Sequence, residues 1–263
     1  PEIEVIPLIK TIVATHKPYT MPEDSMYLPV QVGAAGRLSI GFQRDDQGEN
    51  ISRLNRYYCE LTGLYWAWKN LDADYIGLAH YRRHFKGKKK GKTPFDSVLT
   101  SSEAEKLLEN TDIILPKKRN YVIESVASHY GHTHYAADLN KTRGIIGTQF
   151  PEYLPAFDRH MKSTSSHMFN MFIMKKELLD SYCSFLFPVL FALQKQVDFV
   201  KYDDFQARLF GRISELLLDV WIDTNHHTYS EVPVISMEPV PWLKKGTAFL
   251  QAKFFGKKYE GSF

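Results

Sequence analysis

Hydrophobic and polar positions alternate along the chain in patterns that predict strands and helices in turn. Apolar and β-branched residues cluster at 9–14 and at 27–32, which predicts two short strands. Between residues 55 and 70, apolar side chains recur every three or four positions, as they do on one face of a helix. The apolar run 75–79 is too short for a helix and predicts a third strand, buried in a sheet.

The same alternation continues through the second half of the chain. Strands that alternate with helices indicate a three-layer α/β domain with a mostly parallel central sheet. We expect this domain to span residues 1–241, and a basic, aromatic C-terminal tail with helical character to follow at 242–263. The further elements predicted are helices at 101–110, at 175–194 with a kink at Pro188 and from about 209 onward, and strands at 112–115, 168–174 and 232–237.

Composition places the protein among ordinary soluble globular proteins. Of its 263 residues, 24% are charged and 44% hydrophobic, and the net charge of +3 is too small by itself to indicate a nucleic-acid partner. No signal peptide is recognised, and no apolar run approaches the roughly eighteen residues of a membrane span. We therefore expect a cytoplasmic protein. Cys59 and Cys183 fall in apolar helical patterns and are expected to be buried, reduced thiols.

Basic and polar residues follow three of the predicted strands. Thr15-His16-Lys17 follows the first strand, the run 80–83 follows the strand at 75–79, and Lys117-Lys118-Arg119 follows the strand at 112–115. The carboxyl ends of parallel strands meet at one edge of a sheet, where ligands bind in open α/β folds. The repetition predicts a site for an anionic ligand such as a phosphate group. A set of solvated basic turns is the alternative.

Two patterns suggest a metal site, but their context opposes it. Asp72 and Asp74 form an Asp-x-Asp pair that precedes a predicted strand, which places them at the opposite edge from the ligand, as a helix–strand turn. His129, His132 and His134 lie close in sequence. Neither a His-Glu-x-x-His motif nor a cysteine pair accompanies them, which disfavours zinc.

Eight segments stand in a fixed order between residues 9 and about 237: Pro29–Ala34, Gly48–Ser52, Tyr58–Thr62, Tyr65–Asn70, Gly77–Arg83, Phe169–Met174, Gln206–Arg208 and Ser214–Leu216. They resemble the signature blocks of a family of bacterial glycosyltransferases from capsule and O-antigen clusters, whose characterised members include galactofuranosyltransferases. The resemblance implies a GT-A-like nucleotide-sugar-binding domain over nearly the whole chain.

The resemblance also implies an activity. The protein is expected to transfer a hexose, galactofuranose or galactose, from a UDP-sugar to a growing surface-polysaccharide acceptor, with inversion at the transferred carbon. The acceptor would be lipid-linked or an oligosaccharide, and the Lys- and Phe-rich tail at 242–263 would attach the protein to the inner membrane face. A non-catalytic carbohydrate-binding module is the alternative. Such a module would need the aromatic residues, 14% of the chain, but not the basic strand ends.

One departure from the resemblance concerns the metal ion. Where such folds usually carry an Asp-x-Asp pair, the strand at 75–79 ends in His80-Tyr81-Arg82. His80 and Arg82 can meet the charge of the leaving diphosphate, because a guanidinium binds phosphate with a bidentate fork. A divalent metal, Mn²⁺ or Mg²⁺, bound through His80 and a later histidine such as His226, is the alternative.

Residue roles follow from these arguments. Tyr202-Asp203-Asp204 followed by Arg208-Leu209 resembles the acidic pair that supplies the base in inverting GT-A enzymes, so Asp204 is the first choice for that base, Asp203 its neighbour and Glu215 the third. In the alternative interpretation, the acidic pair caps a helix. Acceptor binding is assigned to His134, Asn170 and Arg208, and donor binding to Thr15, His16, Lys17, Gly33, Asn50, Ser52, Asn55, Lys69, His80, Tyr81, Arg82 and Arg83.

Overall fold

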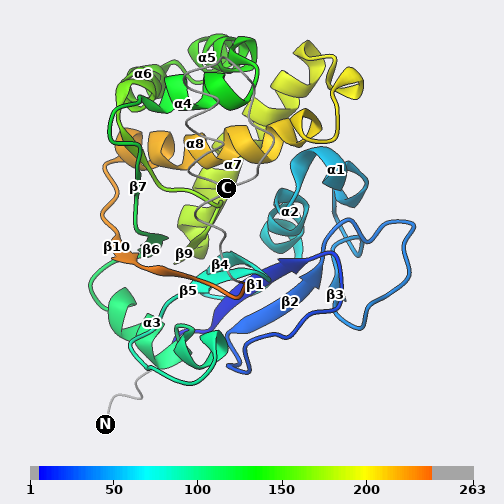
Figure 1. Cartoon of the computed structure of the whole chain (residues 1–263), viewed down its shortest axis with the longest axis vertical. Coiled ribbons are helices and arrows are strands. Elements are labelled where there is room, and N and C mark those ends of the chain that lie inside the picture. Colours follow the sequence, from blue (N-terminus) through cyan, green and yellow to red (C-terminus); the bar gives the residue numbers. More distant parts are fainter. Residues whose placement is uncertain (1–5, 239–263) are drawn as a thin grey trace. The chain divides into compact units, whose positions relative to one another are not determined.

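The computed structural model describes residues 6–238, which divide into two compact units (Figure 1). The predicted boundary at residue 241 and the tail at 242–263 lie outside the described residues. The first unit comprises the described parts of Pro1–Lys117, Phe169–Ser184 and His227–Met237, and the second comprises Lys118–Met168, Phe185–His226 and Glu238.

The first unit is built on a nine-stranded sheet, in which seven strands follow the order β10-β6-β9-β4-β1-β2-β3 (Figure 1). β1 pairs in parallel with β2 and β4, β2 with β3, and β6 with β10, whereas β9 runs antiparallel to β4 and β6. The prediction of an α/β fold with a mostly parallel sheet is confirmed. The strands are β1 (Ile9–Thr15), β2 (Tyr27–Gln31), β3 (Gln43–Arg44), β4 (Tyr75–His80), β5 (Arg83–Phe85), β6 (Ile113–Pro116), β9 (Phe172–Lys175), β10 (Ser230–Val232) and β11 (Val234–Ser236).

The sequence of β1 explains its central place. It is nearly all apolar or β-branched, as in strands that are covered on both faces, and Ile12 and Val13 are fully buried. Helix α2 (Leu61–Asn70) contacts this strand, and Gly63 permits the close approach. A Cβ atom at Gly63 would lie only 2.9 Å from the side chain of Val32, so a larger residue would push the helix away from the sheet.

The predicted helix at 55–70 is interrupted at Cys59. Helix α1 (Asn55–Tyr58) ends there because Cys59 adopts a φ of +53° and a ψ of −131°, which no α-helix contains, and α2 begins at Leu61. The prediction of one uninterrupted helix is therefore wrong at this residue. The remaining helices of the first unit are α3 (Ser101–Leu108), the first part of α7 (Lys176–Gln196), and the short 3₁₀ helices η1 (Ser52–Leu54) and η2 (Pro94–Ser97).

Two predicted strands are also shorter than the apolar pattern indicated. The run 168–174 yields only β9, because Phe169 and Asn170 have φ values of +76° and +53° and form a turn. The run 232–237 is divided at Pro233, which has no N–H to donate to a ladder. β10 before it pairs with β6, and β11 after it pairs with β5.

The second unit is mainly helical. Its longest complete helix, α8, buries most of its residues and packs against α6, while Tyr153 and Phe185 stack at 4.1 Å between ring centroids. The elements are α4 (Val126–Thr133), α5 (Ala136–Gln149), α6 (Leu154–Lys162), the rest of α7, α8 (Leu209–Asn225), the 3₁₀ helices η3 (Pro151–Tyr153), η4 (Phe199–Lys201) and η5 (Gln206–Arg208), and the antiparallel pair β7 (Arg119–Asn120) and β8 (Ser165–Ser166).

Both cysteines are free, as expected. Cys183 is fully buried in α7, and burial raises the pKa of its thiol well above the ordinary value. Cys59 is half-buried at the break between α1 and α2. Among residues 6–238, no helix combines the length and the apolar character that crossing a bilayer requires.

Stability is expected to depend on pH through His84 in β5. Its ring is fully buried against Tyr27, and burial lowers its pKa from 6.5 to about 4. The unfolded chain therefore takes up a proton on His84 near pH 6.5, and the folded chain only near pH 4. The free energy of unfolding therefore falls by about 3 kcal/mol as the pH is lowered from 6.5 to 4. Urea unfolding of wild type and His84→Phe at pH 7 and pH 4.5 measures this loss. Equal pH dependence of the two proteins would contradict it.

Candidate functional site

The segments that follow β1 and β4 lie together at the carboxyl edge of the sheet, because the two strands pair in parallel and end at the same level. Tyr81, buried just after β4, is the common neighbour. The rings of His16 and Tyr81 are 5.5 Å apart, Lys17 Nζ lies 5.4 Å from the centre of the Tyr81 ring, and the guanidinium carbon of Arg82 lies 5.3 Å from it. Cations from two strand ends thus gather around one aromatic ring.

Local hydrogen bonds fix these turns. The Thr15 hydroxyl donates to the carbonyl of Lys17 (2.6 Å) and accepts from its N–H (3.3 Å). The N–H of Arg82 donates to Nδ1 of His80 (3.3 Å). Lys17 is exposed and Arg82 is half-buried, so the positive charges stay near the surface, where an anion can reach them. Roles of these residues in donor binding stay predictions.

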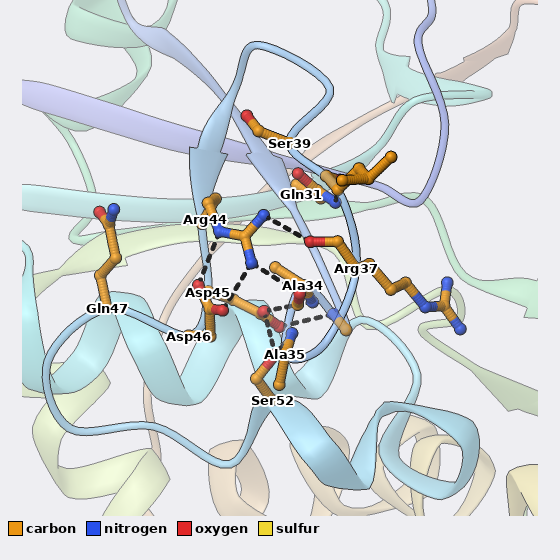
Figure 2. A network of polar contacts seen from close by, with 12 residues as sticks. Gln31, Ala34, Ala35, Arg37, Ser39, Arg44, Asp45, Asp46, Gln47 and Ser52 are labelled. Atoms are coloured by element: carbon orange, nitrogen blue, oxygen red, sulfur yellow. Dashed lines mark hydrogen bonds and ion pairs between the residues drawn. The ribbon is translucent and has the colours of Figure 1, made fainter.

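A buried carboxylate, which the sequence did not single out, holds the loop after β2 (Figure 2). Asp45 accepts from the N–H groups of Gly33 (2.8 Å) and Ala34 (3.0 Å), and from the hydroxyl of Ser52. Gly33 has a φ of +64°, and Asn55 lies so close that no Cβ atom would fit. Gly33 and Ser52, both predicted to bind the donor, therefore shape this loop.

Arg44 holds the same loop through a second set of hydrogen bonds (Figure 2). Its guanidinium donates to both oxygens of Asp46 (3.0 and 2.7 Å), and to the carbonyls of Ala34 (2.7 Å) and Arg37 (3.0 Å). The hydrogen bond from Arg44 lowers the pKa of Asp46. The loop after β2 is thus fixed by two carboxylates and one guanidinium.

Three further residues with predicted donor roles also contact other parts of the protein. The side-chain amide of Asn55 donates to the carbonyl of Cys59 (2.7 Å), and that of Asn50 donates to the carbonyl of Gly48 (2.8 Å). Lys69 Nζ lies 3.7 Å from the centre of the Trp68 ring. Their roles in donor binding stay predictions.

The turn before β9 lies at the same edge of the sheet. Because β9 runs antiparallel to β4, the start of β9 meets the end of β4, which places Asn170 there. Asn170 donates from its amide to Oε1 of Glu60 (2.8 Å), and the guanidinium of Arg83 lies 4.3 Å from the centre of the Phe169 ring. The sequence singled out Asn170 and Arg83, but not Glu60.

The other residues assigned to the acceptor, His134 and Arg208, lie in the second unit. Nδ1 of His134 is 2.8 Å from the guanidinium of Arg212 and 3.3 Å from the side-chain oxygen of Gln206. Arg212 stacks over Phe205 at 3.9 Å. Arg208 ends η5. Arg212 was not predicted as a site residue, since an arginine within a helical pattern gives no local signal.

The three candidate bases differ in their surroundings. Asp203 accepts the N–H of Gln206 (2.8 Å), which is the capping role considered as the alternative, and both Asp203 and Asp204 are exposed. Glu215 is half-buried on α8, and its charge adds to burial in raising the pKa of Tyr121 to about 12. A role in proton transfer stays a prediction for each.

Pairs of histidine with a buried carboxylate were not foreseen. Nδ1 of His167 lies 2.5 Å from Asp219, and this hydrogen bond lowers the pKa of the carboxyl although burial opposes it. Glu124 contacts His129 (3.2 Å) and His132 (2.9 Å). Within residues 6–238, no three side chains of His, Cys, Asp or Glu are arranged to hold a metal ion.

The two residues of the Asp-x-Asp pair lie in the link between α2 and β4, at the amino edge of the sheet. Asp74 accepts the N–H of Leu8 (2.7 Å), and Asp72 pairs with Lys176 (3.2 Å). The interpretation of this pair as a helix–strand turn is confirmed. His80 belongs to the first unit and His226 to the second, so a metal held by both stays untested.

Comparison with known proteins places the chain in a family. Residues 10–226 match the family described as a domain of unknown function, DUF4422. The chain belongs to the DUF4422 family. No curated protein matches it at a significant level. The chain is also similar to a solved structure of a bifunctional glycosyltransferase, WbbM, in its apo form, with 28% identity and a TM-score of 0.80. The match covers 88% of this chain and 46% of that one, so this DUF4422 chain spans about half of WbbM.

Proposed function

We propose that this DUF4422 protein is a glycosyltransferase that moves a hexose, galactofuranose or galactose, from a UDP-sugar to a growing surface polysaccharide. The observation that carries the proposal is the group of cations after β1 and β4, where Lys17 and Arg82 lie beside Tyr81. Such a group at the carboxyl edge of a parallel sheet suits a nucleotide diphosphate. Similarity to WbbM, a bifunctional glycosyltransferase, supports the reaction class.

The transfer breaks the bond between the anomeric carbon and the diphosphate oxygen, and forms a bond from that carbon to an acceptor oxygen. Negative charge builds on the leaving UDP, where the guanidinium of Arg82 and the ammonium of Lys17 stabilise it. The acceptor hydroxyl loses its proton to a base, for which Asp204 is the first choice. Inversion follows when the acceptor attacks from the face opposite UDP.

The turn after β4 does not fit the metal ion that GT-A-like folds commonly use. A divalent cation prefers carboxylate ligands, and here the turn after β4 offers a histidine and two guanidinium groups, while Asp72 and Asp74 lie at the opposite edge. The proposed steps therefore use charges of the protein. Attachment to the inner membrane face through residues 242–263, and a lipid-linked or oligosaccharide acceptor, are proposals of the same kind.

UDP is expected to raise the melting temperature through contacts with Thr15, His16 and Lys17. A ligand at one hundred times its Kd stabilises the folded state by about 2.7 kcal/mol, which shifts the melting temperature by several degrees. Thermal-shift measurements with UDP, GDP, CMP and dTDP, each with Mn²⁺ and with EDTA, test this. Lys17→Ala is expected to reduce the shift.

The outcomes separate the alternatives. If UDP leaves the melting temperature unmoved while another nucleotide raises it, the UDP assignment fails. A shift that requires Mn²⁺ would restore the metal-dependent alternative. A protein that responds to oligosaccharides and to none of the nucleotides would be a carbohydrate-binding module.

A further inference from the structure

Backbone strain in the first unit gathers at one place. Within residues 6–238, five residues other than glycine have a positive φ, and three of them, Cys59, Phe169 and Asn170, belong to two turns that meet. Cys59 combines a φ of +53° with a ψ of −131°, a region that side chains disfavour. Such strain costs free energy and persists mainly where the surrounding structure enforces it, often at functional sites.

The two strained turns meet at a carboxylate. Glu60, which precedes α2, receives the hydrogen bond from the amide of Asn170 on its Oε1 atom (2.8 Å). On the other side, the amide of Asn55 holds the carbonyl of Cys59 (2.7 Å). The amide of Asn170 therefore holds the half-buried side chain of Glu60, and the amide of Asn55 holds the backbone just before it.

Glu60 also lies at the edge of the sheet that carries the cations. Helix α2 leads from this edge back to the start of β4, so its first residues lie where β1 and β4 end. The start of β9 reaches the same edge from the other side. The chemistry of Glu60 is opposite to that of Lys17 and Arg82, because a carboxylate repels phosphate and accepts hydrogen bonds from hydroxyl groups.

We propose that Glu60 binds a hydroxyl group of the transferred sugar, with Asn170 as its positioning residue. The inference rests on the proposed function, since it concerns the sugar half of a nucleotide-sugar. Oε1 is held by Asn170, and Oε2 accepts the sugar hydroxyl. The cations bind the diphosphate and the carboxylate binds the sugar, so the two halves of the donor are recognised by opposite charges at one edge of the sheet.

Calorimetric titration of the full chain with UDP, UDP-galactopyranose and UDP-galactofuranose tests the assignment. Wild type is expected to bind one of the UDP-sugars more tightly than UDP. Glu60→Gln should lower the affinity for that UDP-sugar by about 10- to 100-fold, which is the scale for a hydrogen bond to a charged group. The affinity for UDP should stay unchanged. Glu177→Gln is the matched control, because Glu177 lies in the first turn of α7, which follows β9 at the opposite edge.

Asn170→Gly provides an independent variant. Glycine accepts the φ of +53° without strain, so the variant keeps the turn and removes only the amide that orients Glu60. It should lower the affinity for the UDP-sugar several-fold and not that for UDP, a split that a general loss of structure would not produce. If Glu60→Gln does not fold, the binding of UDP and of the UDP-sugar to Asn170→Gly tests the role of Glu60 instead.

The inference is overturned if Glu60→Gln and Asn170→Gly bind the UDP-sugar like wild type, or if wild type binds UDP and both UDP-sugars equally. Failure of wild type to bind UDP or any UDP-sugar is a different result, because it contradicts the proposed function itself.

Discussion

Replacing Arg82 by alanine is expected to lower the turnover of glycosyl transfer by about 10²–10³-fold, the scale for loss of one oriented charge stabiliser. Arg82 follows β4 at the cationic edge, and its guanidinium carbon lies 5.3 Å from the centre of the buried Tyr81 ring. That contact limits where the side chain can point, and the hydrogen bond from the backbone N–H of Arg82 to His80 fixes the turn that carries it. The loss should appear in kcat, because charge on the diphosphate grows as the bond to the sugar breaks.

Arg82→Lys is expected to restore little of this activity. An ammonium supplies the charge but not the planar fork that binds two phosphate oxygens at once. Arg143→Ala is the control, since it removes a surface guanidinium that pairs with Asp158 in the second unit. The assay is release of UDP with a saccharide acceptor. Full activity of Arg82→Lys would mean that charge alone suffices, and full activity of Arg82→Ala would remove the residue from the mechanism.

Much of the sheet could be predicted from the sequence, because each strand is marked by its own run of apolar residues. β1 and β4 are buried on both faces and therefore read as continuous apolar runs, and parallel pairing carries the residues after each strand to one edge. The meeting of His16 and Lys17 with Tyr81 follows from those two facts alone. Predicting that these residues meet therefore required no knowledge of contacts between side chains far apart in the sequence.

The breaks in the pattern could not be predicted, because distant residues cause them. Apolar periodicity runs straight through Cys59 and through Phe169, so nothing local announces a positive φ there. The Glu60–Asn170 hydrogen bond joins side chains 110 positions apart and fixes both turns. A glycine at any of these positions would have been a signal, and none is present.

Buried carboxylates escaped prediction for a related reason. In the sequence, Asp45 is one of several polar residues in an apparent surface turn, yet it is fully buried because three hydrogen-bond donors replace water around it. Asp219 likewise lies within an amphipathic helix, and only the fold brings His167 to it. Charge in a sequence does not reveal whether partners will compensate its burial.

The acidic pair before α8 yields the second large effect. Asp204→Asn is expected to lower the rate of transfer by about 10²–10⁴-fold, the contribution of a positioned general base. Affinity for UDP should stay nearly unchanged, because the proposed partner of Asp204 is the acceptor hydroxyl. Asparagine keeps the shape of the side chain and cannot take up the proton.

Asp203 is the natural comparison, because it is the neighbouring carboxylate and is exposed like Asp204. Asp203 accepts the N–H of Gln206, and asparagine at position 203 can still accept this hydrogen bond. Asp203→Asn should therefore lower the rate of transfer far less than Asp204→Asn.

Circular dichroism confirms folding, and single-turnover transfer measures the chemical step. A folded Asp204→Asn protein with near-normal transfer would falsify the base assignment and leave Glu215 to be tested next. A loss shared equally by the two variants would instead mean that both carboxylates hold the turn before α8.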